Sequence, residues 1–150
     1  MSDSKETLFT DEEVCSQAKG NAAGAVYALI AYAKECGRSP ADVASFVGSK
    51  FAPSWENEQG QGASRILRYM ALNLVSCGAE VRSFSGDDIR AEARISGFPS
   101  EVDAAAFGVS QGEADRFYDV FGPIAKHVGS DFDWRRHGDE VVMTVQRKMK

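Results

Sequence analysis

The chain has 150 residues, the usual size of one domain and enough to bury a core without disulfides or a structural metal. Its net charge of −5 argues against the basic surface of a nucleic-acid-binding protein. The longest apolar run, from Ala22 to Ala33, is too short to span a bilayer, and the start has no signal-peptide core. We therefore expect a single cytoplasmic domain over residues 1–150, frayed over residues 1–9, with no nucleic-acid or membrane partner.

The strongest helix signal runs from Val14 to Cys36. A capping box from Thr10 to Glu13 precedes it, and Gly37 follows at the position where helices commonly end. The opposite sides of this helix are both apolar, so we predict that it is the buried centre of the fold. One stripe has three- and four-residue spacing and carries Val14, Ala18, Ala22, Ala25, Leu29, Ala33 and Cys36.

Two shorter helices follow in the sequence. Ser39-Pro40 is a helix start, and that helix should end over residues 48–51. The next helix is predicted over residues 63–77. Two interpretations are open for the segment between them, residues 52–64: a lid over a site, or a plain connection with one helical turn.

After these helices, apolar and polar residues alternate with the two-residue period of a β-strand. Residues 79–85 and 89–95 predict one hairpin, and residues 132–136 and 140–146 predict another. Between the hairpins, a capping box at Ser110 begins a helix to about residue 128, which Pro123 should break near Gly122.

These elements together predict an α+β fold, with helices packed on one face of an antiparallel sheet of about four strands. The layout resembles small intracellular ligand-binding domains that place helices on one face of an antiparallel sheet. That resemblance is architectural and implies no particular residues or activity.

Small residues on the long helix and on one strand suggest a hollow between them. Gly20, Ala23 and Gly24 lie on the helix, and Ala91 and Ala93 share the inward face of a strand. Such residues either let the two walls touch or leave a pocket. We hypothesise a small-molecule-binding or sensory module whose ligand and cofactors the sequence does not identify, with further lining residues Tyr27, Trp55, Glu56, Glu58 and Tyr69.

Two alternatives stay open. The first is a small-metabolite enzyme in which Glu56 and Glu58, beside an aromatic wall, or His127 act as acid or base. The second is a homodimeric interaction subunit without ligand. No metal site is expected, because the histidines and cysteines lack metal-ligand spacing. The three cysteines, Cys15, Cys36 and Cys77, are predicted to be reduced and in or near the core.

Overall fold

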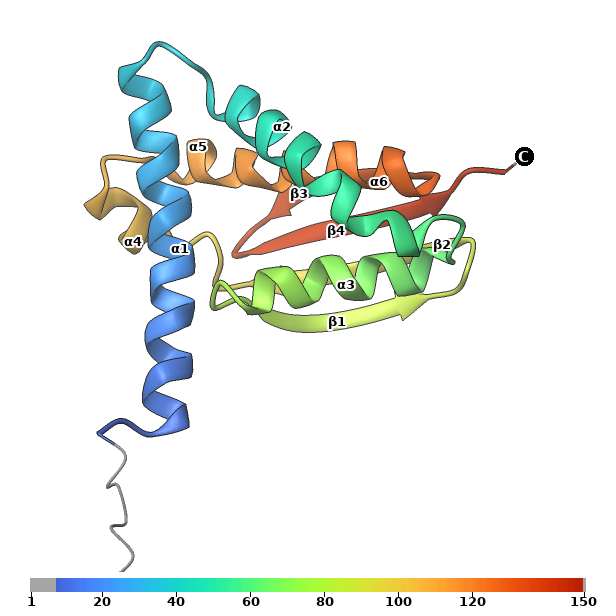
Figure 1. The fold of residues 1–150 in the computed structure, drawn as a ribbon, viewed down its shortest axis with the longest axis horizontal. Helices are drawn as coiled ribbons and strands as arrows, with labels where there is room; N and C mark the ends of the chain where they lie inside the picture. The colour runs from blue at the N-terminus through green and yellow to red at the C-terminus, as the bar shows by residue number, and fades with distance from the viewer. Residues whose placement is uncertain (1–7, 150) are drawn as a thin grey trace, which may run out of the picture.

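The computed structural model describes residues 8–149 and shows the predicted α+β fold (Figure 1). The first half of the chain is helical, and the second half alternates between hairpins and helices. The elements are α1 (Asp11–Glu35), α2 (Pro40–Phe51), the 3₁₀ helix η1 (Ala52–Glu58), α3 (Ala63–Val75), β1 (Glu80–Gly86), β2 (Arg90–Ser96), α4 (Glu101–Ala106), α5 (Gln111–Asp115), the 3₁₀ helix η2 (Arg116–Val120), α6 (Phe121–Val128), β3 (Ser130–His137) and β4 (Glu140–Arg147).

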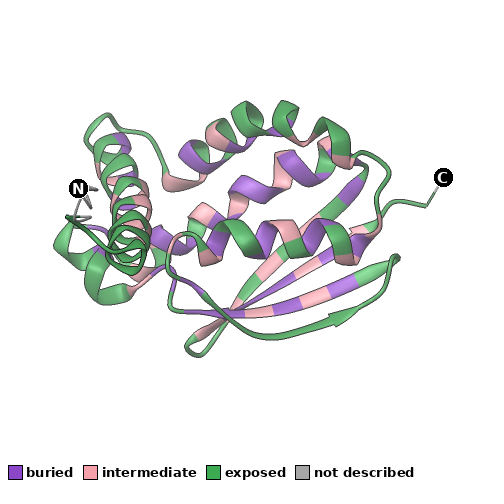
Figure 2. Ribbon diagram, turned by 60° about the horizontal axis from the view of Figure 1, so that its bottom comes forward, coloured by how far each residue is buried: buried purple, intermediate pink, exposed green. Residues whose placement is uncertain are grey.

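The two predicted hairpins join into one antiparallel sheet with the strand order β1-β2-β4-β3. Helices α3 and α6 pack on one face of this sheet, and α2 lies over η2 and α6 (Figure 2). As predicted, Ala91 and Ala93 of β2 are buried, and together with Ile95 they belong to the core under the helices. Arg90, which alternates with them, is exposed.

The predicted helix over residues 111–128 is divided, as the proline indicated. It consists of α5, η2 and α6, and α6 begins two residues before Pro123. Proline has no N–H to donate to the carbonyl of Asp119, so a continuous α-helix through this point would lose a hydrogen bond. Because of the break, η2 packs against α2, while α6 packs on the sheet.

Residues 52–64 form a packed connection. Their first part is η1, which contacts α6 and α2. Gln59 Nε2 donates to the carbonyl of His127 at 3.2 Å, and the N–H of Gly60 donates to the carbonyl of Val128 at 3.2 Å. Because these contacts hold the segment against α6, they favour a plain connection and not a lid.

The expected burial of the long helix is not confirmed. Of the 25 residues of α1, only Tyr27, Ile30 and Ala33 are buried. The helix stands at one end of the molecule, and its first half projects beyond the sheet and the other helices (Figure 1). Alanine is the strongest helix former and has a small side chain, so an alanine-rich pattern predicts a helix without predicting that the helix is covered.

Candidate functional site

The structure does not bring the two walls of the predicted pocket, the small residues of α1 and the alanines of β2, together. Ala91 and Ala93 are 1% and 0% exposed and lie in the filled core against α3. On α1, a Cβ atom added to Gly20 would meet nothing within 4 Å, and one added to Gly24 would lie 3.5 Å from the ring of Phe107. Gly20 therefore faces solvent and Gly24 faces Phe107, which follows α4, so neither glycine faces the alanines of the sheet.

Tyr27 has a structural role as the anchor of α1. Its ring is 1% exposed and stacks on Phe98, with ring centroids 6.0 Å apart, while Phe107 lies on another side at 5.7 Å. Its hydroxyl accepts a hydrogen bond from the N–H of Ser100 at 2.8 Å. Burial raises the pKa of the Tyr27 phenol above its usual value. Ala23 of α1 is half-buried and packs against the same core.

Trp55, Glu58 and Tyr69 do lie together, around a shallow hollow of about 250 Å³. Trp55 meets Tyr69 edge to face, with centroids 6.4 Å apart. Both carboxylate oxygens of Glu58 accept from Arg65, at 2.7 and 3.1 Å, and this bond holds the pKa of Glu58 below its usual value. A carboxylate saturated in this way is poorly suited to act as a general acid.

Glu56 and His127 also meet, because η1 packs on α6. Glu56 Oε2 lies 2.9 Å from His127 Nε2, and 65% of the Glu56 side chain is exposed. Over residues 8–149, no group of three or more histidine, cysteine, aspartate or glutamate side chains could hold a metal ion. The pair is thus a side-chain contact at the surface, with the Glu56 carboxylate largely in solvent.

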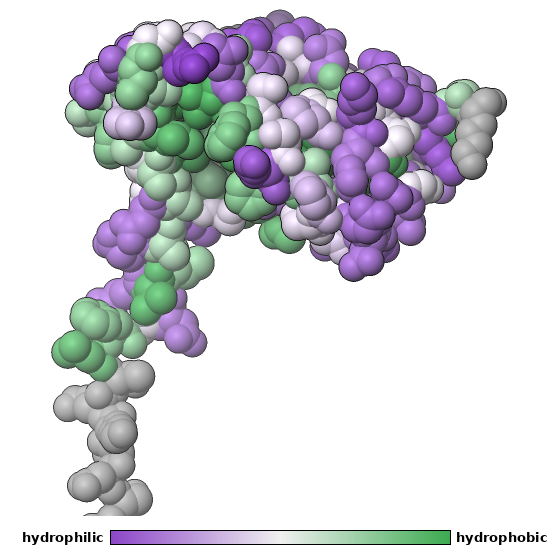
Figure 3. Space-filling model, turned by 45° about the horizontal axis from the view of Figure 1, so that its top comes forward, coloured by the Kyte–Doolittle hydropathy of each residue, from purple (hydrophilic) through white to green (hydrophobic). Residues whose placement is uncertain are grey.

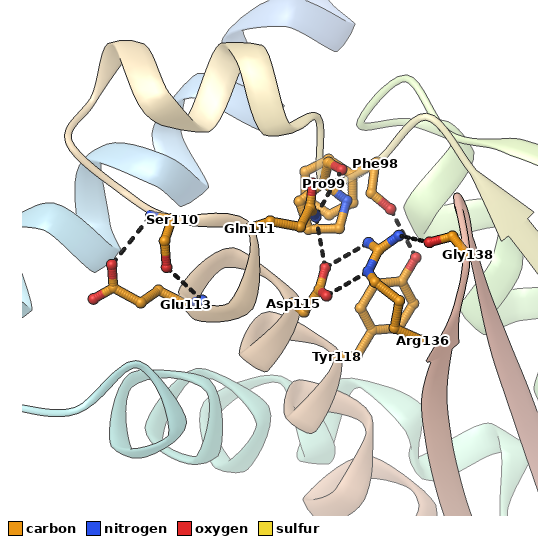
Figure 4. A network of polar contacts seen from close by, with 9 residues as sticks. All are labelled: Phe98, Pro99, Ser110, Gln111, Glu113, Asp115, Tyr118, Arg136 and Gly138. Atoms are coloured by element: carbon orange, nitrogen blue, oxygen red, sulfur yellow. Dashed lines mark hydrogen bonds and ion pairs between the residues drawn. The ribbon is translucent and has the colours of Figure 1, made fainter.

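A buried polar network lies between α5 and β3 (Figure 4). Asp115 is 5% exposed and accepts from two nitrogens of Arg136, at 2.5 and 2.6 Å, which raises the pKa of that guanidinium. Gln111 donates both to Asp115 at 2.8 Å and to the carbonyl of Pro99 at 3.3 Å. Beside them, Tyr118 donates to the carbonyl of Phe98 at 2.8 Å. These groups satisfy one another, so the network ties the hairpin to the helices and offers no free group to a ligand.

The outer face of α1 is the largest departure from the predicted core. Seven apolar residues alternate at three- and four-residue spacing, the pattern of a coiled-coil contact line. This line, which we name the α1 seam, lies opposite Tyr27 on the helix and consists of Cys15, Ala18, Ala22, Ala25, Leu29, Tyr32 and Cys36. All but the half-buried Ala22 are exposed, including Leu29 at 40% and Tyr32 at 66%.

The C-terminal end of the seam opens into an apolar groove between α1 and α2. The groove has a volume of about 580 Å³, and Figure 3 shows apolar side chains gathered there and along α1. Phe46 of α2 is 63% exposed on its far wall. We name it the α1–α2 groove; its lining is Leu29, Tyr32, Ala33, Cys36, Arg38, Asp42, Val43, Phe46 and Val47.

The cysteines differ from the expectation that all three lie in or near the core. Cys15 and Cys36 are exposed and Cys77 is half-buried, and all three thiols are free. Two of the three therefore lie on the α1 seam, because the helix that was expected to be buried presents its stripe to solvent.

Sequence reasoning found an apolar stripe on this helix but expected the helix to be covered on all sides, and the stripe did not include Tyr32. The alternating three and four spacing from Cys15 to Cys36 is the signal that could have indicated a contact with another helix. Between residues 8 and 149, no helix is long and apolar enough to cross a membrane. Comparison with known proteins gives no matching family model, no matching curated protein and no matching solved structure.

Proposed function

We propose that this protein is an interaction subunit that works by self-association through the α1 seam. The observation that carries this proposal is the first half of α1, residues 11–21, in which no side chain is buried although the helix carries an apolar line. An exposed apolar patch without an enclosed pocket is typical of a protein-interaction surface.

The stability of the projecting half supports the same conclusion. A helical segment as short as residues 11–21 is only marginally stable in water when it has no tertiary contacts. Gly20 weakens this segment further, by about 1 kcal/mol relative to alanine. The capping box at Thr10 returns part of that stability. A second helix packed on the seam would bury its apolar side chains and stabilise the projecting half.

Light scattering coupled to size-exclusion chromatography tests the proposal. For the full chain we expect a mass of about twice 16.2 kDa at high concentration, falling towards the monomer on dilution. Tyr32→Lys places a charge on the seam and should leave a monomer. Ser16→Lys, on the opposite side of α1, is the matched control and should still dimerise. A wild-type chain that is monomeric throughout the series would refute the proposal.

A small-molecule-binding role stays a separate prediction. It is tested by a thermal-shift screen against a metabolite library, since a ligand that binds only the folded state raises the melting temperature. A reproducible rise with one chemical class would favour that role, and no rise would favour the interaction subunit.

A further inference from the structure

We infer that the α1 seam pairs antiparallel with the same seam of a second copy, and that each α1–α2 groove receives Leu8 and Phe9 of the partner. This inference rests on the proposed function and specifies its geometry. Three features of the described residues support it: the sizes of the seam residues, the charges at the two ends of α1, and the apolar residues that precede the helix.

The seam residues are small at one end and large at the other. Cys15 and Ala18 belong to the projecting half and the half-buried Ala22 follows it, whereas Leu29 and Tyr32 lie near the body. A parallel pair would set Ala18 against Ala18 and Tyr32 against Tyr32, leaving voids at one end and crowding at the other. Efficient packing disfavours both.

An antiparallel pair matches small residues with large ones on both sides of a central alanine pair. If Ala22 faces the partner's Ala25 near the two-fold axis, Ala18 faces the partner's Leu29 and Cys15 faces the partner's Tyr32. In the heptad notation of coiled coils, each a position meets a d position of the other helix. A two-fold axis repeats every such contact, so the seam is complementary to itself.

The charges at the ends of α1 favour the same orientation. The helix begins with Asp11, Glu12 and Glu13, and a parallel pair would bring two such acidic ends together. In the antiparallel register, Asp11 lies beside the partner's Cys36, and Arg38 follows two residues later. Arg38 makes no ion pair within residues 8–149, whereas Lys34 is already paired with Glu113. The acidic end therefore meets an available cation and the carbonyl end of a helix.

The same register carries the chain before α1 to the α1–α2 groove. Leu8 and Phe9 are 83% and 61% exposed, and they immediately precede the capping residue Thr10. With Asp11 beside the partner's Cys36, these two residues reach the groove that Cys36 and Phe46 line. An apolar groove and an exposed aromatic side chain thus meet twice in each dimer, once at each end of the pair.

Disulfide trapping in the full chain tests the register. Tyr32→Cys is made together with Cys36→Ser, which removes the neighbouring thiol, and the protein is oxidised mildly at a concentration where it is dimeric. We expect a covalent dimer in which the introduced thiol is joined to Cys15 of the other copy. Ser16→Cys with Cys36→Ser is the matched control and should give little covalent dimer. In the wild type the two Cys15 residues would lie about 25 Å apart, so they should not join.

The occupant of the groove is tested by Phe9→Ala against Phe51→Ala. Phe51 is exposed to a similar extent, 57%, but does not line the groove. We expect Phe9→Ala to raise the dimer dissociation constant by about tenfold or more, since a buried aromatic anchor is lost at both ends. Phe51→Ala should leave the constant unchanged. Far-UV circular dichroism of each variant checks that it is folded.

The outcomes separate this inference from the proposed function. A monomeric wild type overturns both. A dimer that fails to trap position 32 with Cys15, or a wild type that joins Cys15 to Cys15, keeps self-association and overturns the antiparallel seam. If position 32 is trapped with Cys15 but Phe9→Ala leaves the dimer dissociation constant unchanged, the antiparallel seam stands and the placement of Phe9 in the groove is overturned.

Discussion

Tyr27 should account for most of the stability with which α1 is held to the body. Two substitutions divide its contribution. Tyr27→Phe removes only the hydroxyl, which accepts from the N–H of Ser100 at 2.8 Å, and we expect a loss of about 0.5–1.5 kcal/mol. Tyr27→Ala also removes a ring that is 1% exposed between Phe98 and Phe107, and we expect a loss of about 3–5 kcal/mol.

Urea denaturation measures both losses as shifts of the midpoint at constant slope. All proteins are compared at one concentration, because a dimer that exists only when folded makes stability depend on concentration. Hydrogen exchange should show faster exchange in α1 of Tyr27→Ala and little change in the sheet. A loss below about 1 kcal/mol for Tyr27→Ala, or equal losses for the two variants, would refute the assignment of Tyr27 as the anchor.

Three further outcomes follow from single contacts. Gly20→Ala should raise the free energy of unfolding by about 0.5–1 kcal/mol, because the added Cβ meets nothing within 4 Å; a lower urea midpoint would contradict this. Ala93→Leu should lower the free energy of unfolding by about 1–3 kcal/mol, because the filled core has no hollow for the added carbons; a tolerated leucine, seen as an unchanged midpoint, would show that a cavity exists. The pKa of Glu113 in the folded protein is held low by Lys34 and by the N–H of Ser110. The stability that this carboxylate contributes is therefore present above the pKa that Glu113 has in the unfolded chain, and it is lost as the pH falls through the pKa of the folded protein. The difference in unfolding free energy between wild type and Glu113→Gln should therefore be largest at neutral pH and vanish in acid; a difference that does not change with pH would contradict this assignment.

Local hydrogen bonding explains why most of the fold could be predicted. Thr10 and Ser39 cap α1 and α2 as expected, because each side chain reaches a backbone N–H three residues later in the chain. Gly37 has a φ of 72° after α1, a conformation that glycine adopts easily. The buried alternation of Ala91 and Ala93 likewise depends only on the two-residue period of a strand.

The candidate site could not be predicted in the same way, because it depends on contacts between distant parts of the chain. The ring of Tyr27 could have faced any apolar surface, and Ser100 is 73 residues away in sequence. Tyr32 and Phe46 come together only because α2 turns back beside α1. An apolar stripe identifies the face of a helix that is suited to contact, but it does not say whether the contact is inside the chain or with another copy.

The projecting half of α1 also affects how this protein moves through solution. A compact chain of this length has a radius of gyration of about 15 Å, and a helical arm of eleven residues adds about 16 Å on one side. Such a shape has a larger frictional coefficient than a sphere of equal mass, so a monomer would elute early from a sizing column and sediment slowly. Elution volume alone would then report a monomer as a larger species. In a dimer with the two arms side by side, the frictional coefficient would rise by less than the doubling of the mass implies.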